Sequence, residues 1–269
     1  MFVSLCAVDN ALRDLFGVRK KGYCVVLYYH AVATKHRTLF SRQMDVLLRL
    51  TTPISANSVA IPQPGERFAV ITFDDGLESV VENALPELEV RQIPSAVFIV
   101  TQSLGRAPIW MNVSADSVNV PRVMSREQLL NVDKSLVTIG SHSLTHPNLT
   151  RVGIAEATRQ ISDSRTVLRK MLGREVSLFS FPYGAFNEDL IKCCREAGYE
   201  RVFTSLPILA LTNSGEFALG RISVEPTDWA LEFRLKLLGA YRWLPGAVAL
   251  KRRLRTFWQK SASAGLQNR

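Results

Sequence analysis

Two adjacent carboxylates, Asp74 and Asp75, end an apolar run in the sequence Phe68-Ala69-Val70-Ile71-Thr72-Phe73-Asp74-Asp75-Gly76. Such a run predicts a buried strand, and two acids at its end repel each other unless a proton or a metal ion lies between them. Because Asp and Gly also favour turns, a simple turn is the alternative interpretation. The pair therefore indicates a cation site if the chain offers further ligands.

The sequence His142-Ser143-Leu144-Thr145-His146 follows another apolar stretch, 136–139, and can supply those ligands. One carboxylate and two imidazoles form the three-ligand set of a catalytic divalent metal, which leaves a position for water or substrate. The second carboxylate is then free to act as a base. Two histidines at this spacing can instead cap a loop through hydrogen bonds, and the residues alone leave that alternative open.

Length and composition indicate one globular domain followed by a tail. The chain has 269 residues, of which 47% are hydrophobic and 21% charged, and no run of about 18 apolar residues that could span a membrane. The start of the chain lacks the basic residues and cleavage site of a secretory signal. The four cysteines, Cys6, Cys24, Cys193 and Cys194, form no CxxC pair. We therefore expect a cytoplasmic protein with reduced thiols.

The net charge of +9 is concentrated near the end of the chain. Residues 230–260 contain eight bases and one acid, which gives +7 and leaves +2 for the rest. Aliphatic and aromatic residues alternate with these bases, as in segments that lie on anionic lipid at the inner face of a membrane. A docked C-terminal helix with a basic face is the alternative. Nucleic acid is not expected, because no recognised binding motif accompanies the charge.

Short apolar runs alternate with helical patterns along residues 24–203, which predicts an α/β fold. We expect a parallel sheet of about seven strands that closes into, or curls toward, a barrel. Residues that follow strand ends then face one rim of the barrel. The strand ends that carry chemical side chains are Tyr29-His30, Asp74-Asp75, His142 with His146, and Pro182-Tyr183-Gly184. The least regular stretch, 102–121, is a candidate substrate loop.

Three of these motifs, Thr72–Gly76, Ser141–His146 and Phe181–Gly184, occur in an order that resembles the polysaccharide deacetylases of carbohydrate esterase family four. The resemblance covers about residues 22–225. It implies a distorted (β/α) barrel. We therefore expect a catalytic domain over residues 1–228 and, from the charge pattern, a basic amphipathic tail over 229–269. The resemblance also implies that Asp74 is the general base and that Asp75, His142 and His146 bind the metal.

No histidine follows His146, so the catalytic acid of the family's last motif is missing. The sequence Tyr29-His30-Ala31-Val32 resembles the N-terminal motif of a permuted branch that acts on exopolysaccharides, in which this histidine takes the place of that acid. The resemblance therefore implies that His30 is the acid and that His36, in the following loop, is not. A satisfied core histidine is the alternative for His30.

One position departs from the family pattern. Ser180 stands where the third motif usually carries an arginine that pairs with the base, and Arg221 is the candidate replacement. A structural surface arginine is the alternative. Tyr183 is a candidate for contact with the substrate or, through a nearby backbone N–H, with the oxyanion, although Pro182-Tyr183-Gly184 is equally compatible with a rigid turn.

Together these features predict a metal-dependent hydrolase that removes N-acetyl groups from amino sugars of a polysaccharide or lipid-linked glycan. A divalent metal polarises an amide carbonyl and acidifies water, a carboxylate takes the water's proton, and an acid protonates the leaving amine. Zn²⁺ is the default for histidine and carboxylate ligands, and Ni²⁺, Co²⁺ or Fe²⁺ also fit. The alternatives are an O-deacetylase of the same fold and an inactive relative that binds glycan or membrane.

Overall fold

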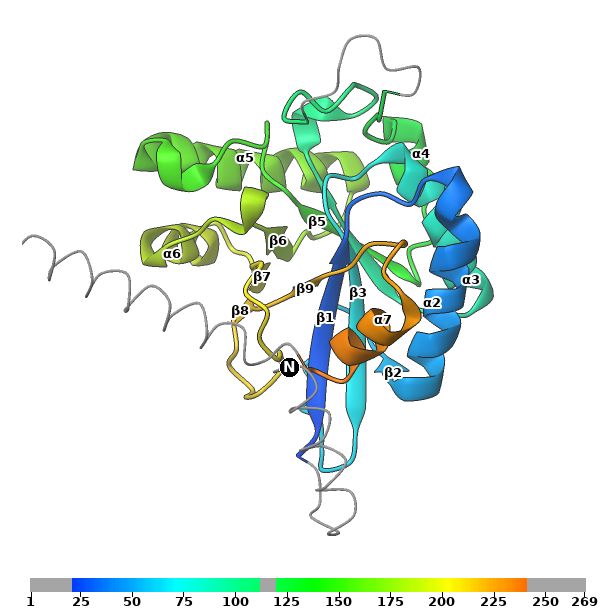
Figure 1. Ribbon diagram of the computed structural model, residues 1–269. Helices are drawn as coiled ribbons and strands as arrows, with labels where there is room; N and C mark the ends of the chain where they lie inside the picture. Colours follow the sequence, from blue (N-terminus) through cyan, green and yellow to red (C-terminus); the bar gives the residue numbers. More distant parts are fainter. Residues whose placement is uncertain (1–20, 112–119, 241–269) are drawn as a thin grey trace, which may run out of the picture.

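The computed structural model describes residues 21–111 and 120–240, which fold around one parallel sheet (Figure 1). In chain order the strands are β1 (Tyr23–Tyr29), β2 (Thr52–Pro53), β3 (Arg67–Phe73), β4 (Ser95–Ile99), β5 (Val137–Ser141), β6 (Leu178–Ser180), β7 (Arg201–Phe203), β8 (Ala218–Leu219) and β9 (Ile222–Ser223). Their order across the sheet is β8-β7-β6-β5-β4-β3-β1-β9, and β2 pairs with β3. Because every strand pair is parallel, the carboxyl ends of the strands meet at one edge.

The two edges of this sheet are joined by one short stretch of chain. Only Gly220 and Arg221 separate β8, which pairs with β7, from β9, which pairs with β1. The predicted distorted (β/α) barrel is therefore confirmed. The described residues contain nine strands where about seven were expected, and three of the nine are only two residues long. Strands of that length carry too few residues for a sequence pattern.

Helices surround the sheet (Figure 1). They are α2 (Arg37–Leu50), α3 (Leu85–Val90), α4 (Arg126–Asn131), α5 (Ile154–Leu172), α6 (Glu188–Glu196) and α7 (Ala230–Leu237). The expected capping box begins α4, where the Gln128 N–H donates to Ser125 Oγ and the Ser125 N–H donates to Gln128 Oε1. The helices cover the outer face of the strands and leave the strand ends free to carry a site.

Side chains along each strand alternate between two cores. Val26 and Val70 face the barrel interior, whereas their neighbours Leu27 and Ile71 lie in the outer core under the helices. Continuing the same alternation from Val70 brings Asp74, four residues later, to the interior face at the carboxyl edge. The barrel is thus apolar in its lower part and polar where the strands end.

The first helix of the predicted tail, α7, belongs to the folded body. Its residues Phe233 and Leu237 are buried in the outer core, and the helix contacts α2. Lys236 is nearly buried and lies 2.5 Å from Asp228 and 2.9 Å from Glu232. Residues 241–269 lie outside the described residues, so the amphipathic tail and its contact with lipid stay predictions. No helix in the described part of the chain is long and apolar enough to cross a membrane.

We expect Phe233→Ala to lower the free energy of unfolding by about 3–5 kcal/mol, because it leaves a cavity in the outer core. Leu231→Ala is the matched control, since this side chain on the same helix is 60% exposed. It should change stability by no more than about 0.5 kcal/mol. Urea denaturation measures both variants. Equal, small effects would show that α7 does not contribute to the core.

Candidate active site

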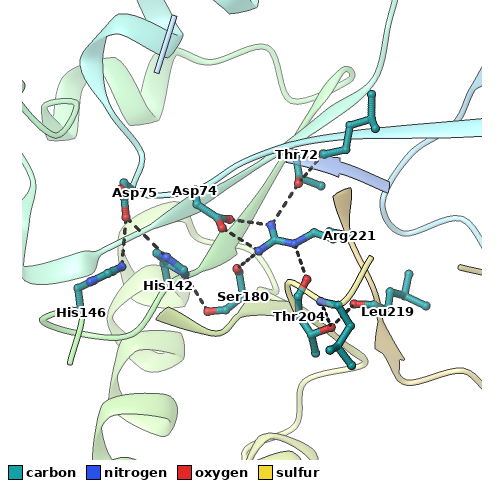
Figure 2. A network of polar contacts seen from close by, with 11 residues as sticks. Thr72, Asp74, Asp75, His142, His146, Ser180, Thr204, Leu219 and Arg221 are labelled. Carbon is teal, nitrogen blue, oxygen red and sulfur yellow. Dashed lines mark hydrogen bonds and ion pairs between the residues drawn. The ribbon is translucent and has the colours of Figure 1, made fainter. Parts of the chain in front are cut away.

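Asp75, His142 and His146 converge at the carboxyl edge of the sheet. The Asp75 Oδ1 atom lies 3.6 Å from His142 Nε2 and 3.3 Å from His146 Nε2 (Figure 2). All three residues are buried, and their ligand atoms lie within 4.8 Å of one another. Atoms bound at about 2.0–2.2 Å to one tetrahedral ion lie roughly 3.4 Å apart. The spacing therefore fits a shared divalent metal ion.

The protonation of the cluster also fits a metal. His142 Nδ1 donates to the Ser180 carbonyl oxygen at 2.8 Å, so its Nε2 lone pair faces Asp75. Burial lowers the pKa of His142 to about 4, which keeps the ring neutral near pH 7. Asp75 Oδ1 is buried and makes no hydrogen bond to the described residues. A buried carboxylate oxygen of this kind needs a cation to offset its desolvation.

Several residues in and beside the candidate metal site have unusual backbone conformations. Positive φ angles occur at Asp75 (67°), Ser143 (68°), His146 (64°) and Tyr183 (58°), none of which is glycine. A non-glycine residue in this region costs energy and persists only where its surroundings hold it. Strand alternation alone would send Asp75 to the outer core, opposite Asp74. The left-handed conformation at Asp75 breaks that alternation, so both aspartates line the same cavity.

Asp74 forms a bidentate ion pair with Arg221. The guanidinium donates to Asp74 Oδ1 at 2.8 Å and to Oδ2 at 2.7 Å (Figure 2). Its other N–H groups donate to Ser180 Oγ, Thr72 Oγ1 and the Thr204 carbonyl oxygen. All five N–H donors of Arg221 are therefore used within the protein. The expected pairing of Arg221 with Asp74 is present. Arg221 also donates to Ser180, the residue that stands where the family pattern usually has an arginine.

Two opposing effects act on the pKa of each aspartate, namely burial and the neighbouring basic side chains. Burial alone raises the pKa of Asp74, but Arg221 and then His142 outweigh it and hold the pKa well below its usual range. Burial likewise raises the pKa of Asp75, and His146 and His142 lower it again. Both carboxyl groups are thus ionised at neutral pH, one next to an arginine and the other next to two imidazoles.

His30 follows β1 and lies at the same rim as the aspartates. Its ring packs edge-on against Tyr28 with centroids 5.6 Å apart, and Tyr28 in turn lies under the Arg221 guanidinium at 4.6 Å. Asn83 donates to the Val32 carbonyl oxygen at 2.8 Å and fixes the loop that leaves His30. By contrast His36 belongs to a short 3-10 helix, Thr34–His36, and does not line the cavity described next.

A cavity of about 340 Å³ brings the predicted site residues together. Its lining residues are Tyr28, His30, Asp74, Asp75, Trp110, Met111, His142, His146, Tyr183, Gly184, Ser205 and Arg221. Tyr183 is 57% exposed and packs edge-on against His146. Trp110, which stacks on His146 with centroids 4.6 Å apart, was not predicted as a site residue. Its only signal in the sequence was its place in the irregular stretch 102–121.

The model of the polysaccharide deacetylase family matches residues 62–202, just over half of the chain, and the chain belongs to this family. The poly-beta-1,6-N-acetyl-D-glucosamine N-deacetylase of Staphylococcus aureus is 28% identical over 174 residues, which make up 64% of this chain and 58% of that protein. The chain thus spans little more than half the length of this curated relative.

Solved structures share the fold. IcaB from Ammonifex degensii matches with a TM-score of 0.67 and 23% identity, over 82% of this chain and 98% of that one. The Streptococcus pyogenes deacetylase PplD matches with a TM-score of 0.66 and 18% identity, over 80% of this chain and 98% of that one. The distorted barrel expected from the sequence is therefore the fold of these two structures.

We expect His142→Ala to lose stoichiometric binding of a divalent metal, because it removes one of three ligand atoms. Metal analysis after dialysis against Zn²⁺ measures the loss, and circular dichroism checks that the barrel remains folded. His36→Ala, which removes an imidazole outside the cavity, is the control and should bind as the wild type does. Full binding by His142→Ala would show that this cluster is not the metal site.

Proposed function

We propose that this protein is a metal-dependent N-deacetylase acting on N-acetylated amino sugars of a polysaccharide or lipid-linked glycan. One observation carries the proposal: a three-ligand cluster, an ion-paired aspartate and a histidine line a single cavity at the strand ends. Membership of the polysaccharide deacetylase family supports it. The name of the Staphylococcus aureus relative supports an N-acetylglucosamine polymer as the class of substrate.

Asp75, His142 and His146 would hold the metal, with Zn²⁺ the first choice for this donor set and Ni²⁺, Co²⁺ or Fe²⁺ compatible with it. When bound, the ion supplies Lewis acidity toward the acetyl carbonyl and acidifies water. The chain contributes the fixed spacing of these ligand atoms and the neutral imidazole of His142. A ligand set held in this way needs little rearrangement when the metal arrives.

Asp74 is the base in this proposal. Its carboxylate faces the cavity beside the cluster and is ionised at neutral pH, so it can accept a proton from the attacking water. Arg221 fixes both carboxylate oxygens and thereby the direction of the remaining lone pairs. Because every N–H of Arg221 is used, it acts by positioning Asp74 and not by contacting the oxyanion.

His30 is the acid in this proposal. It lines the cavity beside the two aspartates and can donate a proton to the amine nitrogen as the carbon–nitrogen bond breaks. The backbone N–H of Tyr183 is the proposed donor to the oxyanion of the tetrahedral intermediate. The exposed Tyr183 ring at the mouth of the cavity offers a surface for a sugar ring.

We expect Asp74→Asn to lower turnover by about two to four decades, the range for the loss of a general base. The variant keeps the size of the side chain, and metal content should stay stoichiometric because Asp74 is not a ligand. Acetate release from N-acetylglucosamine oligomers measures turnover, and elemental analysis measures the metal. If Asp74→Asn instead lost its metal, the roles of the two aspartates would be reversed.

We expect His30→Ala to slow amide hydrolysis far more than hydrolysis of nitrophenyl acetate. An amine must be protonated before it leaves, whereas an activated phenolate leaves without help from an acid. The high-pH limb of the rate profile should also disappear for the amide substrate. The control, His36→Ala, should leave both rates unchanged. Equal losses on the two substrates would assign His30 a structural role.

The same assays separate the alternatives. Acetate release from O-acetylated but not from N-acetylated oligomers would favour an O-deacetylase. A protein that bound stoichiometric Zn²⁺ and released no acetate from either panel would contradict the proposal for these substrates. A protein that bound no metal would point to an inactive relative.

A further inference from the structure

Gln160 of α5 is buried and bonds to the loop that joins His142 to His146. Its Oε1 atom accepts the backbone N–H groups of Leu144 and Thr145, each at 3.1 Å. Its Nε2 atom donates to Thr145 Oγ1 at 3.0 Å and to Glu156 Oε1 at 2.9 Å. The Gln160 amide therefore accepts two hydrogen bonds and donates two, and three of these four bonds go to the loop.

This loop needs support from outside because its own conformation is costly. Ser143 and His146 have φ angles of 68° and 64°, and the His146 N–H donates to Ser143 Oγ at 3.0 Å. Such residues stay in the left-handed region only when neighbouring groups hold them there. On the other side of the loop, the backbone N–H groups of Thr101 and Gln102 donate to the carbonyl oxygens of Ser143 and Leu144. Gln160 thus binds the N–H side of a loop whose carbonyl side is held by another segment.

We propose that Gln160 is a positioning residue that sets the metal affinity of the site by holding His146 within reach of Asp75. This inference rests on the proposed metal-dependent function. Without the amide, the N–H groups of Leu144 and Thr145 lose their buried acceptor. The loop then lowers its free energy when its positive-φ residues relax toward negative φ. His146 Nε2 then leaves its place 3.3 Å from Asp75 Oδ1. Residues that orient metal ligands typically change affinity by about 10–100-fold.

A purely structural role predicts a different result. If Gln160 only satisfied buried backbone groups for the fold, its loss would lower the stability of the metal-free protein and leave the Kd of the folded protein unchanged. Metal affinity measured on folded protein therefore separates the two roles. Turnover at saturating metal is a second readout, because it should largely recover if only affinity has been lost.

The test compares Gln160→Met with Ile161→Val in the full-length chain. Methionine keeps the length of the side chain and removes its hydrogen bonds, whereas Ile161→Val removes one methylene from the adjacent buried residue and no hydrogen bond. The Kd for Zn²⁺ is measured by competition with a chromophoric chelator, and circular dichroism confirms folding. Gln160→Met should raise the Kd about 10–100-fold. Ile161→Val should leave it unchanged.

Two further variants make the result decisive. Gln160→Asn withdraws the amide by one methylene and should also raise the Kd, which provides the test if Gln160→Met does not fold. The double exchange Glu156→Gln with Gln160→Glu keeps an acceptor at position 160 for both loop N–H groups. It also reverses the wild-type bond, with position 156 now donating to position 160, so it should recover most of the affinity.

The outcomes for the inference and for the proposed function are distinct. Folded Gln160 variants with the Kd of the wild type would overturn the positioning role and leave the proposed function intact. A wild-type protein without stoichiometric Zn²⁺ would overturn the metal site itself.

Discussion

The ion pair between Asp74 and Arg221 is a buried charge contact on which both the barrel and the site depend. Only 4% of Asp74 and 1% of Arg221 are exposed, so both charges have lost their water. The desolvation is offset because the pair is bidentate and the remaining donors of Arg221 also find acceptors. Removing one partner of a buried pair typically costs about 3–5 kcal/mol, since the other charge is left without compensation.

The position of Arg221 explains why this contact reaches so far. The residue lies between β8 and β9, where one stretch of chain joins the two edges of the sheet, and it binds groups on β3 and β6. The same guanidinium therefore fixes the barrel closure and the orientation of Asp74. Tyr28 packs on its face and connects it with His30. Closure of the barrel and the arrangement of the proposed base and the proposed acid are thus coupled through one side chain.

The two adjacent aspartates show how a dipeptide can acquire two environments. Asp74 continues the strand alternation into the barrel and meets a permanent cation, whereas the positive φ of Asp75 turns it toward the imidazoles of His142 and His146. A permanent cation beside Asp74 keeps that carboxylate out of the metal cluster. The Asp75 oxygen, which has no hydrogen-bond donor among the described residues, is left for a metal ion. A positive φ at one residue therefore keeps both aspartates in one cavity while giving them different partners.

The sequence by itself determined the long elements and the polar residue types at their ends. The apolar runs gave the long strands, because burial in a parallel sheet requires uninterrupted hydrophobic residues, and the polar residues at their ends marked the rim. Asp74, Asp75, His142 and His146 were identifiable because carboxylates and imidazoles at two strand ends together match a metal-ligand set, although each motif alone also fits a turn or a loop cap. The short strands β2, β8 and β9, and Trp110 beside His146, carried no comparable signal.

Only the tertiary structure decided which distant residues support those at the rim. Arg221 lies 147 positions after Asp74, and the sequence left its pairing open against a surface role. Ser180 and Gln160 contact the site through a carbonyl, a hydroxyl and an amide that many serines and glutamines could supply. Strand alternation and apolar runs are local and can be read along the chain. The partner of a buried charge or of a strained loop depends on how the barrel closes in space, and the sequence pattern does not record that closure.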